Sequence, residues 1–194
     1  MASSKEGVKI VRGEAAETTQ PALLEQARRG DPRAFVDLIR SFDHGFRRLA
    51  YRLLGDRQEL DDVLQEAYAK AFAALPRFRG DSALRTWLYR VVYNTCLDQL
   101  KRRRPEPAVL RPELEEVAPD PADLVATRSV LEAALASLAP IERAAVLLVD
   151  VEGLSYGDAA AIVGVAPGTI ASRLSRARAS LRRSLRTASE GVPT

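Results

Sequence analysis

Apolar residues recur every three to four positions along most of this chain, and strand-like alternation of polar and apolar residues is absent from the sequence. The first such segment opens at Asp31 and Pro32, a favoured N-cap and a favoured first helical residue, and it reaches Gly55. Its apolar positions are Phe35, Leu38, Ile39, Phe42, Phe46, Leu49 and Leu53. The pattern predicts one helix over residues 32–54 that faces a core.

Two further helices are predicted in the same half of the chain. One begins near Asp56 and ends before Pro76, with apolar side chains on one side. Its start carries an acidic cluster of Glu59, Asp61, Asp62 and Glu66. A loop over residues 77–81 then leads to Ser82, the predicted N-cap of a long helix that ends near Arg103.

The second half of the chain predicts four shorter helices. Residues 123–137 form the first, and residues 140–152 form the second, which stops at Gly153. A capping-box-like start at Ser155 opens a short third helix that Gly164 ends, and Pro167 starts the last one. The apolar stripe of the last helix is Ile170, Leu174, Ala177 and Leu181. Two helices joined by such a turn are typical of a helix-turn-helix.

Charge is strongly segregated along the chain, although the formal net charge is only +3. Residues 77–104 hold eight basic and two acidic residues, and residues 167–186 hold six Arg and no acid. Between these stretches, residues 105–127 hold six acidic residues, five Pro and one basic residue. A segment of that composition cannot bury enough apolar surface to pack a core, so it indicates a linker between two domains.

These patterns predict an all-α protein of two small helical domains joined by an acidic, Pro-rich linker. The predicted bounds are 21–104 for a helical bundle, 105–123 for the linker and 124–187 for the helix-turn-helix domain, with flexible tails at 1–20 and 188–194. The single Cys96 excludes an internal disulfide framework, and no signal peptide or membrane-spanning run is recognisable. We therefore expect a cytoplasmic protein without membrane insertion. Because no phosphate loop, metal-ligand cluster or nucleophile-base set is present, we also expect no catalytic site, no metal and no cofactor.

The predicted turn of the helix-turn-helix has restrictive spacing. Ala160 lets two helices approach, Gly164 tolerates positive φ, and Ile170 anchors the second helix against the first. The short side chains of Ala171, Ser172, Ser175 and Ala179 point away from the apolar stripe, with Thr169, Arg176 and Arg178 at the edges. Such a face fits a major groove, with arginines at phosphates or guanine edges. The alternative is an ordinary helical hairpin with a solvated arginine face.

The helix from Ser82 carries a second, independent constellation. Its polar stripe consists of Trp87, Arg90, Asn94, Asp98 and Lys101. Together with Phe78, Arg79 and Arg85, this stripe offers aromatic planes among positive charges, which is the combination that holds unstacked bases of single-stranded nucleic acid. Alternatively, Trp87 and Phe78 are partly buried against the preceding helices and the basic run 101–104 is only solvated. The acidic cluster alone decides nothing, because a solvated helix face explains it equally well.

These motifs resemble a known family of bacterial transcription proteins. Region 2 of the ECF (extracytoplasmic function) sigma factors, group IV of the housekeeping-sigma superfamily, is similar to the segment DDVLQEAYAKAFAALPRFRGDSALRTWLYRVVYNTCLDQLKRRR. Their region 4 is similar to LASLAPIERAAVLLVDVEGLSYGDAAAIVGVAPGTIASRLSRARASLRR, and the resemblance covers about residues 22 to 187. It implies a sigma factor that binds core RNA polymerase, directs it to promoters through their -10 and -35 elements, and helps to melt DNA.

The resemblance also implies roles for particular residues. The opened, single-stranded -10 element would be held by Phe78, Arg79, Gly80, Asp81, Ser82, Arg85, Trp87, Arg90 and Asn94. The -35 duplex would be read by Gly168, Thr169, Ala171, Ser172, Arg173, Ser175, Arg176 and Arg178. The β′ clamp helices of core polymerase would bind Asp61, Asp62, Leu64, Gln65 and Glu66, and the β flap is a further expected contact. An anti-sigma factor and a nucleoid-associated holoenzyme are also expected.

Two positions depart from the family pattern, and two other interpretations stay open. Ala171 stands where many members have an arginine, and Ser175 where an aromatic is often found, so the promoter sequence is not carried over.

A stand-alone helix-turn-helix regulator with an amino-terminal sensor or dimerisation module would leave the stripe of Phe78, Trp87 and Asn94 unexplained. A helical hydrolase or transferase would need a polar catalytic set, which the sequence lacks.

Overall fold

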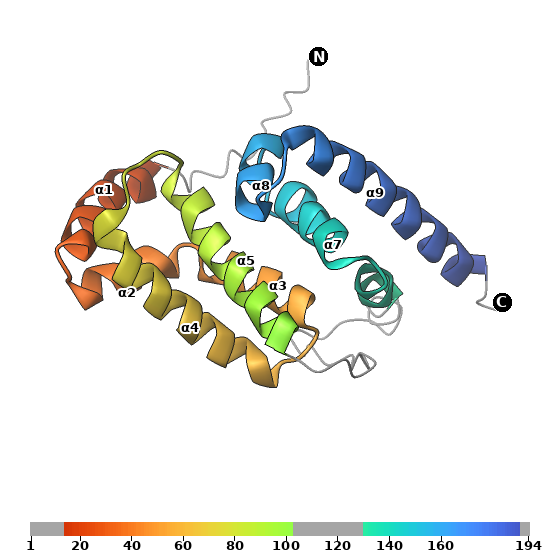
Figure 1. Ribbon diagram of the computed structural model, residues 1–194, viewed down its shortest axis with the longest axis horizontal. Coiled ribbons are helices and arrows are strands. Elements are labelled where there is room, and N and C mark those ends of the chain that lie inside the picture. The colour runs from red at the N-terminus through yellow and green to blue at the C-terminus, as the bar shows by residue number, and fades with distance from the viewer. Residues whose placement is uncertain (1–13, 103–129, 191–194) are drawn as a thin grey trace, which may run out of the picture.

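The computed structural model describes residues 14–102 and 130–190, and within these ranges its regular elements are all helical. An amino-terminal bundle consists of α1 (Glu14–Arg28), α2 (Pro32–Arg40), α3 (Asp43–Leu54), α4 (Gln58–Ala74), a short 3₁₀ turn (Leu75–Arg77) and α5 (Leu84–Arg102). A carboxy-terminal domain consists of a helical segment at 130–136, α7 (Pro140–Val146), a π-helical turn (Leu147–Val151), α8 (Tyr156–Val163) and α9 (Pro167–Glu190). Figure 1 shows the two groups of helices side by side, with α8 next to α5. The all-α, two-domain prediction is confirmed.

The prediction of one helix over residues 32–54 was wrong, because the chain turns within it. Asp31 caps α2 as expected and accepts hydrogen bonds from the backbone N–H groups of Arg33 and Ala34. The hydroxyl of Ser41 then donates to the carbonyl of Leu38 at 2.9 Å, so it competes with the helical backbone for that acceptor. Helix α3 restarts two residues later with its own apolar face on the same core.

Helix α1 lies partly inside the predicted tail, because it begins at Glu14 rather than after residue 20. The sequence did not predict this helix. Its packing rests on Ala27, which is fully buried, with Leu23 and Leu24 partly buried against the core. One small residue and two half-covered leucines make a weak apolar pattern. Residues 1–13, the linker at 105–123 and residues 191–194 lie outside the described residues. Helix α9 reaches Glu190, so it enters the predicted tail at 188–194.

The cores of the two domains differ in the size of their side chains. The rings of Phe46 and Tyr89 meet edge to face at 4.8 Å in the bundle, and both side chains are almost fully buried. Within the described residues, the carboxy-terminal domain buries no aromatic ring, and its core combines aliphatic side chains with five alanines that are 0% to 2% exposed, namely Ala144, Ala145, Ala159, Ala160 and Ala177. The bundle also buries alanines, such as Ala50 and Ala67, but among larger rings. Small residues at these positions let α7, α8 and α9 approach one another closely.

The helix-turn-helix is present at the predicted positions. The hydroxyl of Ser155 accepts a hydrogen bond from the backbone N–H of Asp158 at 3.0 Å, so the capping residue is confirmed. Gly164 ends α8 with φ of 79°, a left-handed conformation that favours glycine. Ile170 and Leu174 are fully buried, so the predicted stripe of α9 anchors it to the domain.

Candidate functional site

The residues predicted to hold an opened strand gather around the start of α5. Phe78 is only 9% exposed and packs against Trp87, with ring centroids 5.3 Å apart. Trp87 itself is half-buried against the core. Partial burial of these rings was the alternative that the sequence left open. Part of the indole of Trp87 therefore remains exposed. Phe78 packs against that indole and has little exposed surface left to offer a base.

Polar groups of the same set lie on the surface beside this pair. Arg79, Gly80, Asp81 and Asn94 are exposed, and Gly80 has φ of 80° in the loop before α5. Asn94 lies on the helical face of Trp87 and Arg90 because the three positions follow the spacing i, i+3 and i+7. The Nε atom of the half-buried Arg90 has no hydrogen-bond partner within the described ranges. An indole, a guanidinium and an amide thus line one strip of α5.

The surface of α9 offers short polar side chains with arginines around them. Ser172, Ser175 and Arg176 are exposed, and Ala171 and Thr169 are half-buried. Arg176 has a long contact of 3.9 Å to Glu142 of the same domain. Gly168 has open space where a Cβ would lie, so no neighbouring chain segment crowds the start of α9. This face has the shape expected of a helix that enters a major groove.

The two other arginines of the predicted -35 set differ in their surroundings. Arg178 donates to both carboxylate oxygens of Asp150, at 3.1 and 2.5 Å, and this hydrogen bonding raises its pKa. Arg173 is half-buried, and its positive charge lowers the pKa of Tyr93 of the bundle against the larger, raising effect of burial. Arg178 is therefore held within the carboxy-terminal domain, and the charge of Arg173 is felt by Tyr93 of the bundle.

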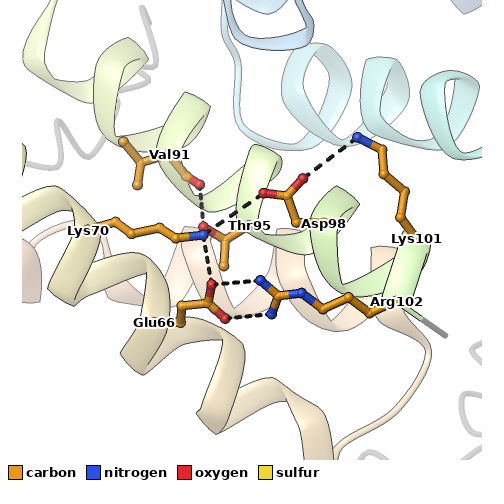
Figure 2. Close-up of polar contacts among 7 residues, drawn as sticks. All are labelled: Glu66, Lys70, Val91, Thr95, Asp98, Lys101 and Arg102. Carbon is orange, nitrogen blue, oxygen red and sulfur yellow. Dashed lines mark hydrogen bonds and ion pairs between the residues drawn. The ribbon is translucent and has the colours of Figure 1, made fainter.

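The predicted polymerase-binding set is split between surface and core. Asp61, Asp62 and Gln65 are exposed, whereas Leu64 is 1% exposed and belongs to the core of the bundle. Glu66 accepts from Lys70 at 2.7 Å and from Arg102 at 3.2 Å (Figure 2), and these hydrogen bonds lower its pKa. Figure 2 also shows Lys70 and Lys101 on either side of Asp98.

A buried hydroxyl connects the acidic cluster to the core. Tyr68 donates to Asp43 at 2.6 Å, and burial followed by this hydrogen bond raises the pKa of the phenol. Arg47 bridges Asp43 at 2.9 Å and Asp61 at 2.8 Å. The carboxylate of Asp61 is thereby held in place, while Asp62 makes no ion pair with any residue of the described ranges.

Several contacts between the two domains were missed by the sequence reasoning. Glu152, at the end of the π-helical turn, accepts hydrogen bonds from Arg48 and Tyr89 of the bundle. Thr86 donates to Asp158 at 2.9 Å, and Arg143 donates to the backbone carbonyl of Arg52 at 2.8 Å. Burial lowers the pKa of Arg143. No periodic pattern marks these polar groups, because their partners lie 63 to 104 residues away along the chain.

No metal-binding or membrane-spanning feature was found in the described part of the chain. Within residues 14–102 and 130–190, no group of three or more potential metal ligands gathers, and no helix is long and apolar enough to cross a bilayer. The free thiol of Cys96 is buried, and burial raises its pKa to about 12.

Comparisons with known proteins place both domains in one class. Residues 38–106 match the model of Sigma-70 region 2, and residues 128–181 match that of Sigma-70 region 4. The ECF RNA polymerase sigma factor SigM of Mycobacterium tuberculosis is 39% identical over 178 residues, which is 91% of this chain and 89% of SigM. The ECF RNA polymerase sigma-E factor of Escherichia coli is 36% identical over 175 residues, 82% of this chain and 91% of that protein.

Solved structures agree with this class. A structure of CnrH in complex with the cytosolic domain of CnrY superposes with a TM-score of 0.68 at 27% identity, covering 87% of this chain and 98% of that chain. The sigma factor RpoE from Bartonella quintana, in complex with the anti-sigma factor NepR, superposes with a TM-score of 0.61 at 29% identity, over 77% of this chain and 97% of that chain. The two domains are thus the paired regions 2 and 4 of a sigma factor. The chain belongs to the ECF RNA polymerase sigma factors, and it directs promoter-specific initiation of transcription together with core RNA polymerase.

Proposed function

We propose that the two domains act on two forms of promoter DNA, with the bundle holding the opened -10 strand and α9 reading the -35 element as a duplex. The observation that carries the proposal is the contrast between their exposed surfaces. Trp87, Arg90 and Asn94 combine an aromatic plane with charge and an amide, which suits unstacked bases. The exposed Ser172 and Ser175 are short and leave room for a base-pair edge.

The polymerase-binding surface in this proposal is the exposed acidic side of α4. Asp61, Asp62 and Gln65 would contact the β′ clamp helices, while the buried Leu64 only supports them. Glu66, with its two basic partners, lies at the edge of this surface. The β flap would contact the carboxy-terminal domain. The protein makes and breaks no covalent bond of its own in this scheme, because polymerase supplies the catalysis, and it works at the nucleoid within the holoenzyme.

An anti-sigma factor is the proposed regulator. The solved structures of CnrH with CnrY and of RpoE with NepR are complexes, and the second partner is an anti-sigma factor. Their similarity to this chain supports a protein partner of the same kind, which would cover surfaces of both domains.

Run-off transcription with purified core polymerase tests the proposal. Initiation is expected only when both components are present. Asp62→Arg reverses a charge that has no ion-pair partner in the described ranges, so folding should survive while core binding and run-off product fall. Asp37→Arg on α2 is the matched control, since that exposed carboxylate pairs with Arg40 of its own helix at 3.1 Å. Undiminished co-purification of the Asp62→Arg variant with core polymerase would remove this surface from the interface.

A further inference from the structure

The contacts between the domains centre on one carboxylate. Glu152 has a side chain only 7% exposed, although it comes from a surface turn of the carboxy-terminal domain. Its Oε1 accepts from Nε and Nη2 of Arg48, at 2.8 and 2.5 Å. Its Oε2 accepts from the phenol of Tyr89 at 2.5 Å and lies 3.6 Å from Nη2 of Arg85. All three partners belong to the bundle, so the charge is neutralised only while the domains are together.

A glycine makes room for this arrangement. Gly45 lies inside α3, where glycine is an unfavourable helix former. A Cβ at this position would lie 2.1 Å from the hydroxyl of Tyr89 and 2.7 Å from Oε2 of Glu152. The lack of a side chain at Gly45 therefore lets the phenol of Tyr89 and the carboxylate of Glu152 come together at this point.

Together these residues form a notch for a carboxylate on the bundle. We propose that this carboxylate notch, made of Gly45, Arg48, Arg85 and Tyr89, receives Glu152 of the same chain and holds the free sigma factor closed. An unpaired buried carboxylate is costly, so the occupant must pair with these groups or leave for water. These polar contacts are directional, and they lie beside buried apolar side chains of both domains that belong to one continuous cluster.

Occupancy of the notch has a consequence for DNA binding that rests on the proposed function. Arg85 belongs to the set proposed to hold the opened -10 strand, yet its Nη2 also donates to the backbone carbonyl of Glu152 at 2.6 Å. Thr86, the next residue, donates to Asp158 at 2.9 Å. The carboxy-terminal domain therefore competes with the opened strand for the start of α5. The strand gains Arg85 only in chains whose domains have come apart.

The first experiment measures the distance between the domains in the free, full-length protein. Dyes or spin labels are attached at Val36→Cys and Arg182→Cys, two exposed positions on α2 and α9, while the buried Cys96 stays unlabelled. Glu152→Gln removes the charge and keeps the shape, and Gly45→Ala inserts a methyl group and keeps every charge. Both should move the distribution toward longer distances. Glu25→Gln, which alters an exposed ion pair with Arg28 within α1, should leave it unchanged. Unchanged distances in both notch variants, with helicity intact, would overturn the proposal.

The second experiment measures the affinity of the same proteins for a mixed-sequence single-stranded DNA 12-mer. Because affinity falls in proportion to the competent fraction, an opened population about tenfold larger should bind about tenfold tighter. The gain from Glu152→Gln should disappear when Arg85→Ala is combined with it, and persistence of the full gain would refute the competition for Arg85. Run-off with saturating core polymerase should be equal for wild type and Glu152→Gln. Loss of run-off in the wild type would instead refute the proposed function, and it would leave the distance result standing.

Discussion

The amino-terminal bundle and the carboxy-terminal domain reach the same helical architecture with different side chains. The bundle packs aromatic rings, with Phe46 between Tyr68 and Tyr89 at centroid distances of 6.3 and 4.8 Å. The carboxy-terminal domain packs alanines such as Ala160 and Ala177 between its helices. On the bundle, the surface of α5 presents an indole, a guanidinium and an amide. On the carboxy-terminal domain, α9 presents short polar side chains. The two domains therefore offer surfaces of different chemistry on similar helical architectures, as the proposed division between opened and duplex DNA requires.

The largest expected effect is a loss of stability in one domain that leaves the other domain folded. Leu174→Ala removes a fully buried side chain from the carboxy-terminal domain, and it should lower the free energy of unfolding of that domain by about 2–5 kcal/mol. Trp87 is the only tryptophan and is packed on the core of the bundle, so its fluorescence follows the unfolding of that domain. In a urea titration, circular dichroism should show early loss of helix while Trp87 fluorescence changes later.

Leu49→Ala is the matching control in the other domain, because Leu49 is fully buried in the bundle. It should move the Trp87 transition to lower urea. If Leu174→Ala shifted both signals equally, the domains would unfold as one unit and the comparison between them would fail.

The next largest effect is expected on the stability of the open complex, through the amide of Asn94. Asn94→Ala removes an exposed amide, and the loss of its hydrogen bonds to a base edge should cost the open complex about 1–3 kcal/mol. Core binding and -35 duplex binding should stay nearly intact. On a promoter with an unpaired -10 segment, rescue would assign Asn94 to nucleating melting, and continued failure would assign it to holding the strand. Gln26→Ala, a loss of an exposed amide on α1, should behave as wild type.

A smaller effect is expected from Arg176 on the other domain. Arg176 is exposed, and its ion pair with Glu142 is long at 3.9 Å, so Arg176→Ala should leave folding unchanged. Loss of one phosphate contact should reduce the slope of log affinity against log salt by about 0.9 for duplex DNA. The measurement is affinity for a fixed -35 duplex across a salt series, with Arg40→Ala on α2 as the control. An unaltered slope would remove Arg176 from the DNA face.

The smallest expected effect is the reaction of the Cys96 thiol, which should be very slow in the native protein. Burial raises the pKa of Cys96 to about 12 from an ordinary value of 9.0, so the native thiol should resist iodoacetamide at pH 8 and react only after unfolding. Between these two values the unfolded chain has lost the proton and the folded chain still holds it. Stability from this group is therefore present below pH 9 and is lost as the pH rises toward 12. Rapid alkylation of the native protein would contradict the buried position.

Much of the fold followed from periodicity, and its failures have physical reasons. The stripe of Ile170, Leu174 and Ala177 and the cap at Ser155 depend on neighbours within a few residues, so a local pattern predicts them. The break at Ser41 was missed because the apolar spacing continues through it. Helix α1 was missed because Leu23, Leu24 and Ala27 make a weak apolar pattern, although the helix packs on the neighbouring α2.

The candidate site could be predicted only in outline. The pattern of Trp87, Arg90 and Asn94 on one helical face follows from spacing alone, and so does the apolar side on which Leu64 lies. The near-complete burial of Phe78 does not, since it depends on how the loop before α5 packs against Trp87. The pairing of Glu152 with Arg48 could not be read from the sequence either, because it joins residues 104 apart. Gly45 inside a helical stripe was the one local sign of that contact.

The central claim is that the bundle opens DNA and the carboxy-terminal domain places the protein on it. Bound complex and permanganate-reactive thymines, measured together on one duplex promoter with core polymerase, test this most directly. Asn94→Ala should lower the number of reactive thymines per bound complex and leave the amount bound nearly unchanged. Arg176→Ala should lower the amount bound and leave the reactivity per complex unchanged. If both variants lowered the same quantity, the division of labour between the two domains would be contradicted.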